Sequence, residues 1–135
     1  MPTIKRIDHI AVIVEDLETT LGFWRDALGI ELTGVEEAAE EAARVAFLPV
    51  GGSQVELVEP TVMDSSLKRF LERRGPGMHH ICLEVDDLQG MLDQLRERGV
   101  QLVNETPRIG SEGRKYAFIH PKSAFGVMVE LYELP

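Results

Sequence analysis

The sequence is poor in cysteine: Cys82 is the only one among 135 residues. A single cysteine excludes an internal disulfide and is typical of proteins from a reducing cytoplasm. Long apolar runs are also missing, because none approaches the roughly 20 residues of a membrane-spanning helix. The segment 1–6 lacks the apolar stretch of a signal peptide. We therefore predict a cytoplasmic protein with no membrane partner.

Positive charge is scarce as well. The chain has 14 lysine and arginine residues against 23 acidic ones, and a net charge of -9. Such a balance disfavours non-specific binding to nucleic acid or to an anionic membrane. With 44% hydrophobic and 27% charged residues, the composition predicts a globular chain with one domain over residues 1–135.

A sequence repeat divides the chain into two halves. Residues 8–17 and 79–88 each contain a histidine, an apolar run and then a Val-acid-Asp-Leu segment. His80 lies 71 positions after His9, and Asp87 lies 71 positions after Asp16. A repeat covering about half the chain indicates a duplicated supersecondary unit.

The pattern within each half predicts an α+β fold of two tandem βαβββ modules. Module one covers about 4–60, a connecting helix about 64–74, and module two about 77–133. The expected strands are 7–14, 30–35, 44–50 and 53–59 in the first module, and 78–85, 100–104, 116–120 and 126–131 in the second. Asp16 and Asp87 are the predicted helix N-caps. The acidic stretch 36–41 is expected to be a loop or a short helical turn.

Four polar residues on separate predicted strands are candidates for one site. They are His9, Glu56, His80 and Glu130. Glu56 and Glu130 each stand between valine and leucine, where an unpaired carboxylate would be costly to bury. Two neutral imidazoles and two carboxylates would neutralise a divalent ion, and this mixed ligand set suits Co²⁺, Mn²⁺, Ni²⁺, Zn²⁺ or Fe²⁺ better than Ca²⁺.

A single strand histidine is more often structural than a metal ligand, so the repeat carries this prediction. His79 is the competing ligand, but only His80 aligns with His9, and we expect His79 to point to the opposite face. His120 follows a predicted strand in a His-Pro-Lys sequence and is interpreted as a substrate contact or as support for a ligand.

The segments 7–12, 55–60, 77–81 and 118–131 resemble the vicinal oxygen chelate (glyoxalase/bleomycin resistance/dioxygenase) superfamily over nearly the whole chain. The His-His-Ile segment with a downstream His-Pro-Lys-Ser is most similar to the methylmalonyl-CoA epimerases. The resemblance implies paired curved mixed sheets around a shared metal site, with His9, Glu56, His80 and Glu130 as ligands of a divalent metal, often cobalt. It also implies a homodimer acting in propionate metabolism on an acyl-CoA substrate.

The implied reaction interconverts (2R)- and (2S)-methylmalonyl-CoA through a metal-stabilised enolate, with Glu130 as ligand and base. Some relatives carry a second catalytic glutamate on the third strand, but residues 44–47 here contain no carboxylate. The opposite proton donor is left open between water, Glu56 and Lys115. Candidate substrate contacts are Lys115, His120 and Lys122. Basic residues at 73–74, 114–115 and 122 could attract the coenzyme A phosphates.

Three rival functions remain. A lactoylglutathione lyase of the same superfamily usually carries an arginine after the first histidine, whereas residues 10–13 are apolar here. A dioxygenase uses two histidines and one carboxylate, so Glu56 as a fourth ligand argues against it. A non-catalytic small-molecule binding protein of this fold would generally lack the four ligands.

Overall fold

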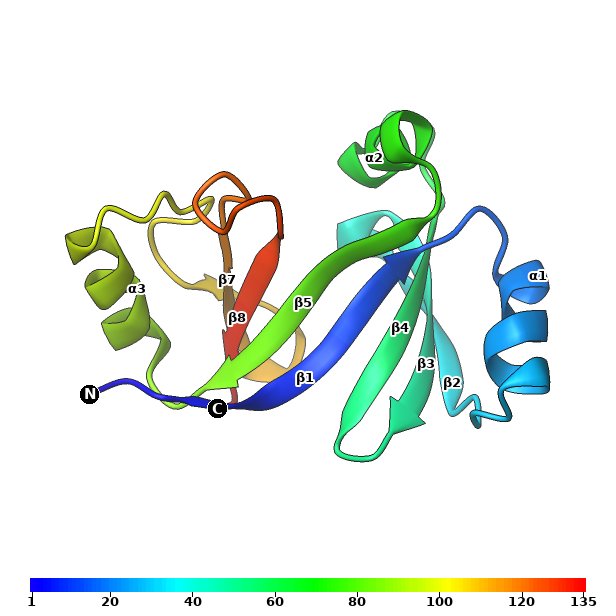
Figure 1. Ribbon diagram of the computed structural model, residues 1–135, viewed down its shortest axis with the longest axis horizontal. Coiled ribbons are helices and arrows are strands. Elements are labelled where there is room, and N and C mark those ends of the chain that lie inside the picture. The colour runs from blue at the N-terminus through cyan, green and yellow to red at the C-terminus, as the bar shows by residue number, and fades with distance from the viewer. The chain divides into compact units, whose positions relative to one another are not determined.

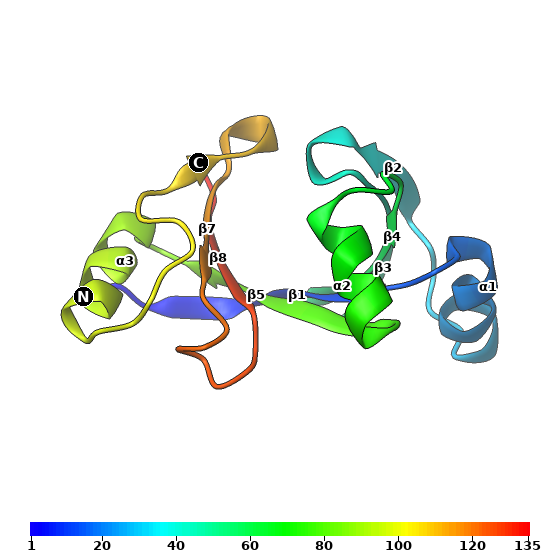
Figure 2. The same cartoon turned by 90° about the horizontal axis from the view of Figure 1, so that it is seen from above.

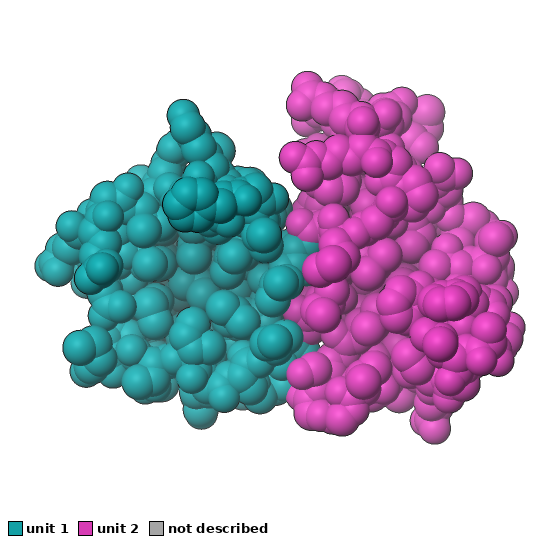
Figure 3. Space-filling model, viewed as in Figure 1, with its two compact units in different colours: residues 1–8, 80–135 teal, residues 9–79 magenta. Residues whose placement is uncertain are grey.

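The computed structural model describes the backbone of residues 1–135 and every side chain except those of Glu40 and Ser111. Two compact units make up the chain: unit 1 contains residues 1–8 and 80–135, and unit 2 contains residues 9–79 (Figure 3). Unit 2 contains most of the predicted module one, the connecting segment and residues 77–79, and unit 1 contains the rest of the predicted module two together with residues 1–8. Each unit combines a four-stranded mixed sheet with helices, which confirms the α+β class (Figure 1).

Unit 2 contains the strand order β2-β3-β4-β1. The strands are β1 (Ile4–Ile13, in this unit from His9), β2 (Gly34–Ala38), β3 (Ala43–Val50) and β4 (Ser53–Pro60). Strand β1 runs parallel to β4, and the other pairs are antiparallel. Helix α1 (Leu17–Leu21) continues into the π-helical turn η1 (Gly22–Ala27), η2 (Ala39–Glu41) joins β2 to β3, and α2 (Ser66–Arg74) follows β4.

Unit 1 repeats this plan with the order β5-β8-β7-β6. Its elements are β5 (Gly77–Val85), α3 (Leu88–Glu97), β6 (Arg108–Ile109), η3 (Ser111–Gly113), β7 (Lys115–Ile119) and β8 (Val129–Glu133). Strand β5 runs parallel to β8, as β1 does to β4. The two units therefore share strand order and strand direction.

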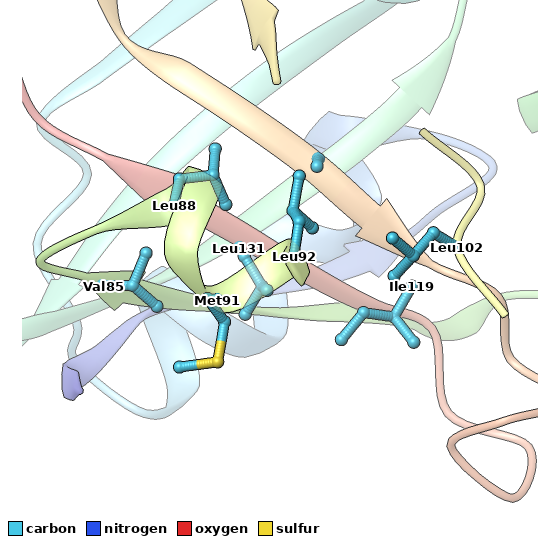
Figure 4. Close-up of a cluster of buried hydrophobic side chains, with 8 residues drawn as sticks. Val85, Leu88, Met91, Leu92, Leu102, Ile119 and Leu131 are labelled. Atoms are coloured by element: carbon cyan, nitrogen blue, oxygen red, sulfur yellow. The ribbon is translucent and has the colours of Figure 1, made fainter. Parts of the chain in front are cut away.

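Each sheet buries one face under a helix. Helix α3 covers the core of unit 1, where Leu88 and Leu92 pack on Leu131 and Ile119 (Figure 4). In unit 2, Leu17 and Leu21 of α1 pack in the same way on one face. Helix α2 lies on the opposite side of β3 and β4 (Figure 2), where its Leu67 contacts a second apolar cluster. The face opposite α3 in unit 1, and the face opposite α1 in unit 2, are called the inner faces below.

Local signals fix the helix starts as predicted. Asp16 accepts a hydrogen bond from the Thr19 backbone N–H at 3.0 Å, and Asp87 accepts one from Gly90 at 3.0 Å. Both aspartates are therefore N-caps, which confirms the prediction.

Three predicted strands are wrong in position. Strand β2 begins at Gly34 rather than residue 30, because Ile30 and Leu32 pack against the α1 core instead of entering the ladder. The acidic residues at 36–38 belong to β2, and only 39–41 form the expected helical turn. Residues 100–104 form no strand and contribute one isolated bridge at Leu102. The last strand begins at Val129 rather than Gly126, after a turn in which Phe125 and Gly126 have positive φ.

Among the described residues, no helix combines the length and the apolar character needed to cross a bilayer.

Candidate functional site

In unit 2, β1 and β4 place a histidine beside a glutamate. Ala11 pairs with Glu56 across the parallel ladder, and His9 stands two residues before Ala11. Because alternate residues share a face of a strand, both side chains lie on the inner face. His9 Nδ1 is 3.3 Å from Glu56 Oε2, and the two side chains are 9% and 17% exposed. The pair is thus largely shielded from solvent.

In unit 1, β5 and β8 build the same arrangement. Cys82 pairs with Glu130, and His80 stands two residues before Cys82. His80 Nε2 is 3.1 Å from Glu130 Oε1, with side-chain exposures of 13% and 17%. The Phe118 ring meets the imidazole edge-on, with centroids 5.6 Å apart. The two units therefore share the strand register, the distance between histidine and glutamate, and the low solvent exposure of both side chains.

The donor chemistry of each pair fits a first-row divalent ion. Two donors held about 2.1 Å from one ion and at right angles to each other lie about 3.0 Å apart. The observed His–Glu separations of 3.3 Å and 3.1 Å are close to that value. An ion would also offset the cost of keeping two carboxylates largely out of water.

A buried polar network lies beside the His80–Glu130 pair on the inner face of unit 1. The Tyr132 hydroxyl donates to Asp8 Oδ1 at 2.8 Å. The same Asp8 oxygen accepts a hydrogen bond from Arg6 at 2.8 Å, and Arg6 Nε donates to Glu84 at 2.9 Å. Asp8, Glu84 and Tyr132 are all at least nine-tenths buried. This network links Arg6 and Asp8 of β1 to Tyr132, two residues after Glu130 on β8, and to Glu84 on β5.

The network also keeps Tyr132 neutral. Burial raises the pKa of Tyr132 well above its ordinary value, and the hydrogen bond to Asp8 and its negative charge raise it further. The tyrosine is therefore a hydrogen-bond donor to Asp8 throughout the physiological pH range.

On the inner face of unit 2, Gln54 pairs with His9, and the positions beyond Glu56 are apolar. Val45 pairs with Val58 and is 4% exposed, and Phe47 pairs with Glu56. Arg44 forms ion pairs with Glu37 and Glu59. Residues 44–47 thus present no carboxylate to this face, as the sequence indicated.

The remaining predicted residues take different places. His79 packs against Phe70 of α2, with ring centroids 4.7 Å apart. His120 follows β7, and its Nδ1 accepts a hydrogen bond from the Lys122 backbone N–H at 3.0 Å. The Lys122 side chain is exposed. Lys115 pairs with Glu133, which places its side chain on the α3 face, opposite to Glu130.

Sequence reasoning did not find the Asp8–Tyr132 contact. Strand alternation did place Tyr132 on the same face as Glu130, so the position of the tyrosine could be predicted. The partner was hidden because Asp8 and Tyr132 are 124 positions apart.

A family model described as "Glyoxalase/Bleomycin resistance protein/Dioxygenase superfamily" matches residues 8–118. Among curated relatives, the mitochondrial methylmalonyl-CoA epimerase of Mus musculus is 36% identical over 93% of this chain and 71% of its own length. The ethylmalonyl-CoA/methylmalonyl-CoA epimerase of Cereibacter sphaeroides is 34% identical over 97% of this chain and 99% of its own.

Solved structures agree with these relatives. A Streptomyces coelicolor methylmalonyl-CoA epimerase variant in complex with 2-nitronate-propionyl-CoA superposes with a TM-score of 0.87 at 35% identity, covering 98% of this chain and 96% of that one. The chain therefore belongs to the glyoxalase/bleomycin resistance protein/dioxygenase superfamily and, within it, to the methylmalonyl-CoA epimerase family.

Proposed function

We propose that this protein is a metal-dependent epimerase that interconverts (2R)- and (2S)-methylmalonyl-CoA. The observation that carries the proposal is the histidine–glutamate pair that recurs with the same strand register in both units. The epimerase relatives support the reaction class, and the acyl-CoA ligand of the solved Streptomyces coelicolor enzyme supports the substrate class.

The two pairs together form the proposed ligand set, His9, Glu56, His80 and Glu130, for a single divalent ion, with Co²⁺ favoured. Sequence and chemistry support this step: the repeat gives each unit one imidazole and one carboxylate, which together neutralise a charge of 2+. Such an ion supplies Lewis acidity toward the thioester and carboxylate oxygens of the substrate.

Glu130 is the proposed base that removes the α-proton. Its carboxylate is largely buried and lies beside His80, whose imidazole the Phe118 ring meets edge-on. A base of this kind must lie within hydrogen-bond reach of the proton it abstracts. Return of the proton to the other face requires a second donor, for which Glu56 and water are the candidates on chemical grounds.

Three further predictions belong to the same proposal. Lys115, His120 and Lys122 stay candidate substrate contacts, although the strand face of Lys115 makes it the weakest of the three. A homodimer and a cytoplasmic location also stay predictions.

Deuterium wash-in tests reaction and cofactor together. The protein is treated with EDTA, incubated with methylmalonyl-CoA in D₂O, and assayed by mass spectrometry before and after Co²⁺ is restored. We expect α-deuterium only after Co²⁺ is added. Wash-in that persists in EDTA would refute metal dependence, and no wash-in with Co²⁺ present would refute the epimerase.

A glutathione hemithioacetal serves as the second substrate in the same preparation. We expect no conversion of this compound. Turnover of the hemithioacetal without deuterium exchange on methylmalonyl-CoA would assign the protein to the lactoylglutathione lyases instead.

A further inference from the structure

We propose that Arg114 is the residue that recognises an oxyanion of the acyl-CoA substrate, either its free carboxylate or a coenzyme A phosphate. This inference rests on the proposed epimerase function and adds a specificity-determining residue to it. Arg114 immediately precedes β7 and belongs to the same unit as His80 and Glu130.

The backbone around Arg114 holds its side chain on the inner face. The Gly110 N–H donates to the Arg114 carbonyl at 2.7 Å, which closes the turn between β6 and β7. Glu112 and Gly113 have φ values of 59° and 74°, so the turn reverses the chain directly before Arg114. Tyr116 pairs with Tyr132, and strand alternation gives Arg114 the same face as these two tyrosines.

The guanidinium carbon of Arg114 lies 5.1 Å from the centroid of the Tyr132 ring. This distance is within the range of a cation–π interaction, which holds the charged group in place without neutralising it. Tyr132 is in turn fixed by its hydrogen bond to Asp8. Tyr132 follows Glu130 by two residues, which is about 7 Å along a strand. Because Phe118 pairs with Glu130 and Tyr116 pairs with Tyr132, Arg114 lies on the same inner face as the proposed base, four residues before Phe118.

Apart from the Tyr132 ring, no described side chain pairs with the charge of Arg114. Among the side chains that the structure describes, none forms an ion pair or accepts a hydrogen bond from this guanidinium. Nearby Arg6, by contrast, is paired with both Asp8 and Glu84. In a chain with a net charge of -9, a half-buried arginine without a described acidic partner, on the same inner face as the proposed base, is the expected complement of an anionic ligand.

The equivalent position in unit 2 has the same strand context but carries no charge. Ala43 precedes Arg114 by the repeat length of 71 residues and is 1% exposed in an apolar cluster. The arginine is thus specific to the unit that carries Glu130, which favours a role in binding over a role in folding.

The test compares Arg114→Gln and Arg114→Lys with wild type in the Co²⁺-loaded enzyme. Arg98→Gln is the matched control, because it removes one exposed charge from the same unit at the end of α3. KM and kcat for epimerisation are measured, and binding of methylmalonyl-CoA is measured separately by calorimetry. We expect Arg114→Gln to weaken binding and raise KM roughly tenfold to hundredfold. Arg114→Lys should recover part of the loss, and Arg98→Gln should change neither value more than twofold.

Methylmalonyl-pantetheine, which lacks the coenzyme A phosphates, separates the two oxyanions. If Arg114→Gln impairs the pantetheine ester as strongly as the coenzyme A ester, Arg114 binds the carboxylate; impairment of the coenzyme A ester alone assigns a phosphate. Unchanged KM and affinity for both esters would overturn the inference. Wild-type protein that neither binds nor epimerises methylmalonyl-CoA would instead reject the proposed function, and this inference with it.

Discussion

The inner faces of the two units have the same strand plan and share a histidine, a glutamate and a phenylalanine. Farther along the same strands, unit 1 carries polar side chains where unit 2 carries apolar ones. His80, Glu130 and Phe118 of unit 1 correspond to His9, Glu56 and Phe47 of unit 2. The next positions differ, and the corresponding pairs are Glu84 and Ile13, Tyr132 and Val58, Tyr116 and Val45, and Arg114 and Ala43. The shared part of the repeat is thus the set of proposed metal ligands with one aromatic neighbour.

This difference indicates a division of labour. Unit 1 surrounds its glutamate with groups that donate hydrogen bonds or carry charge, which suits proton transfer and anion recognition. In unit 2, Gln54 is the polar neighbour of the His9–Glu56 pair, and beyond Glu56 the face continues into an apolar cluster that includes Val45, Val58 and Leu67. The comparison predicts that equivalent substitutions in the two units will have unequal effects on catalysis and equal effects on metal binding.

The largest difference in catalysis is expected between Glu130→Gln and Glu56→Gln, measured as the rate of deuterium wash-in. An amide cannot accept the α-proton, so Glu130→Gln should slow deuterium wash-in by about a hundredfold to ten-thousandfold. An amide oxygen can still face an ion, so Glu56→Gln should slow it by less than about tenfold. Wash-in rates of both variants with Co²⁺ present decide the matter. Equal losses would show that both glutamates transfer protons, and full exchange by Glu130→Gln would remove its role as base.

Metal content tests the second expectation, that equivalent substitutions in the two units reduce metal binding equally. If the two pairs hold one ion, His9→Ala and His80→Ala should each abolish stoichiometric Co²⁺ binding, as measured by elemental analysis after dialysis. If each pair held its own ion, either variant would retain one. His79→Ala is the matched control, since His79 adjoins His80 in the chain but packs on Phe70. Loss of metal from the His79→Ala variant would contradict the assignment of His80, rather than His79, as the ligand.

The four proposed ligands were chosen from the sequence because they lie in the repeat and on strands. The structure places each histidine beside the glutamate of its own unit, and their role as metal ligands stays a prediction. Strand alternation indicates which face of its strand His80 or Glu130 occupies. The constant offset of 71 residues identifies His9 as the residue that corresponds to His80 in the other half of the repeat. Both helix caps were also predictable, since the signal of Asp16 and Asp87 is local.

The chemistry that distinguishes the two units was not predictable in the same way. Asp8 and Tyr132 meet across 124 positions, and Arg114 reaches the Tyr132 ring only because a turn with two positive φ angles precedes it. Strand β2 was misplaced for a related reason: Ile30 and Leu32 have strand propensity, but the α1 core takes their side chains first. Tertiary packing overrides local preference in each of these cases.

The smallest predicted effect concerns the hydrogen bond from Tyr132 to Asp8, which unit 2 lacks because Val58 stands at the corresponding position. Tyr132→Phe keeps the ring and removes the hydroxyl, and Asp8 still accepts from Arg6, so the free energy of unfolding should fall by about 1 kcal/mol. Urea unfolding at neutral pH measures this change. Tyr116→Phe makes the same chemical change on the adjacent strand, where the side chain is half-exposed, and should cost less than about 0.5 kcal/mol. Equal costs for the two variants would mean that the buried contact adds no stability, and that the polar character of unit 1 is maintained for the substrate alone.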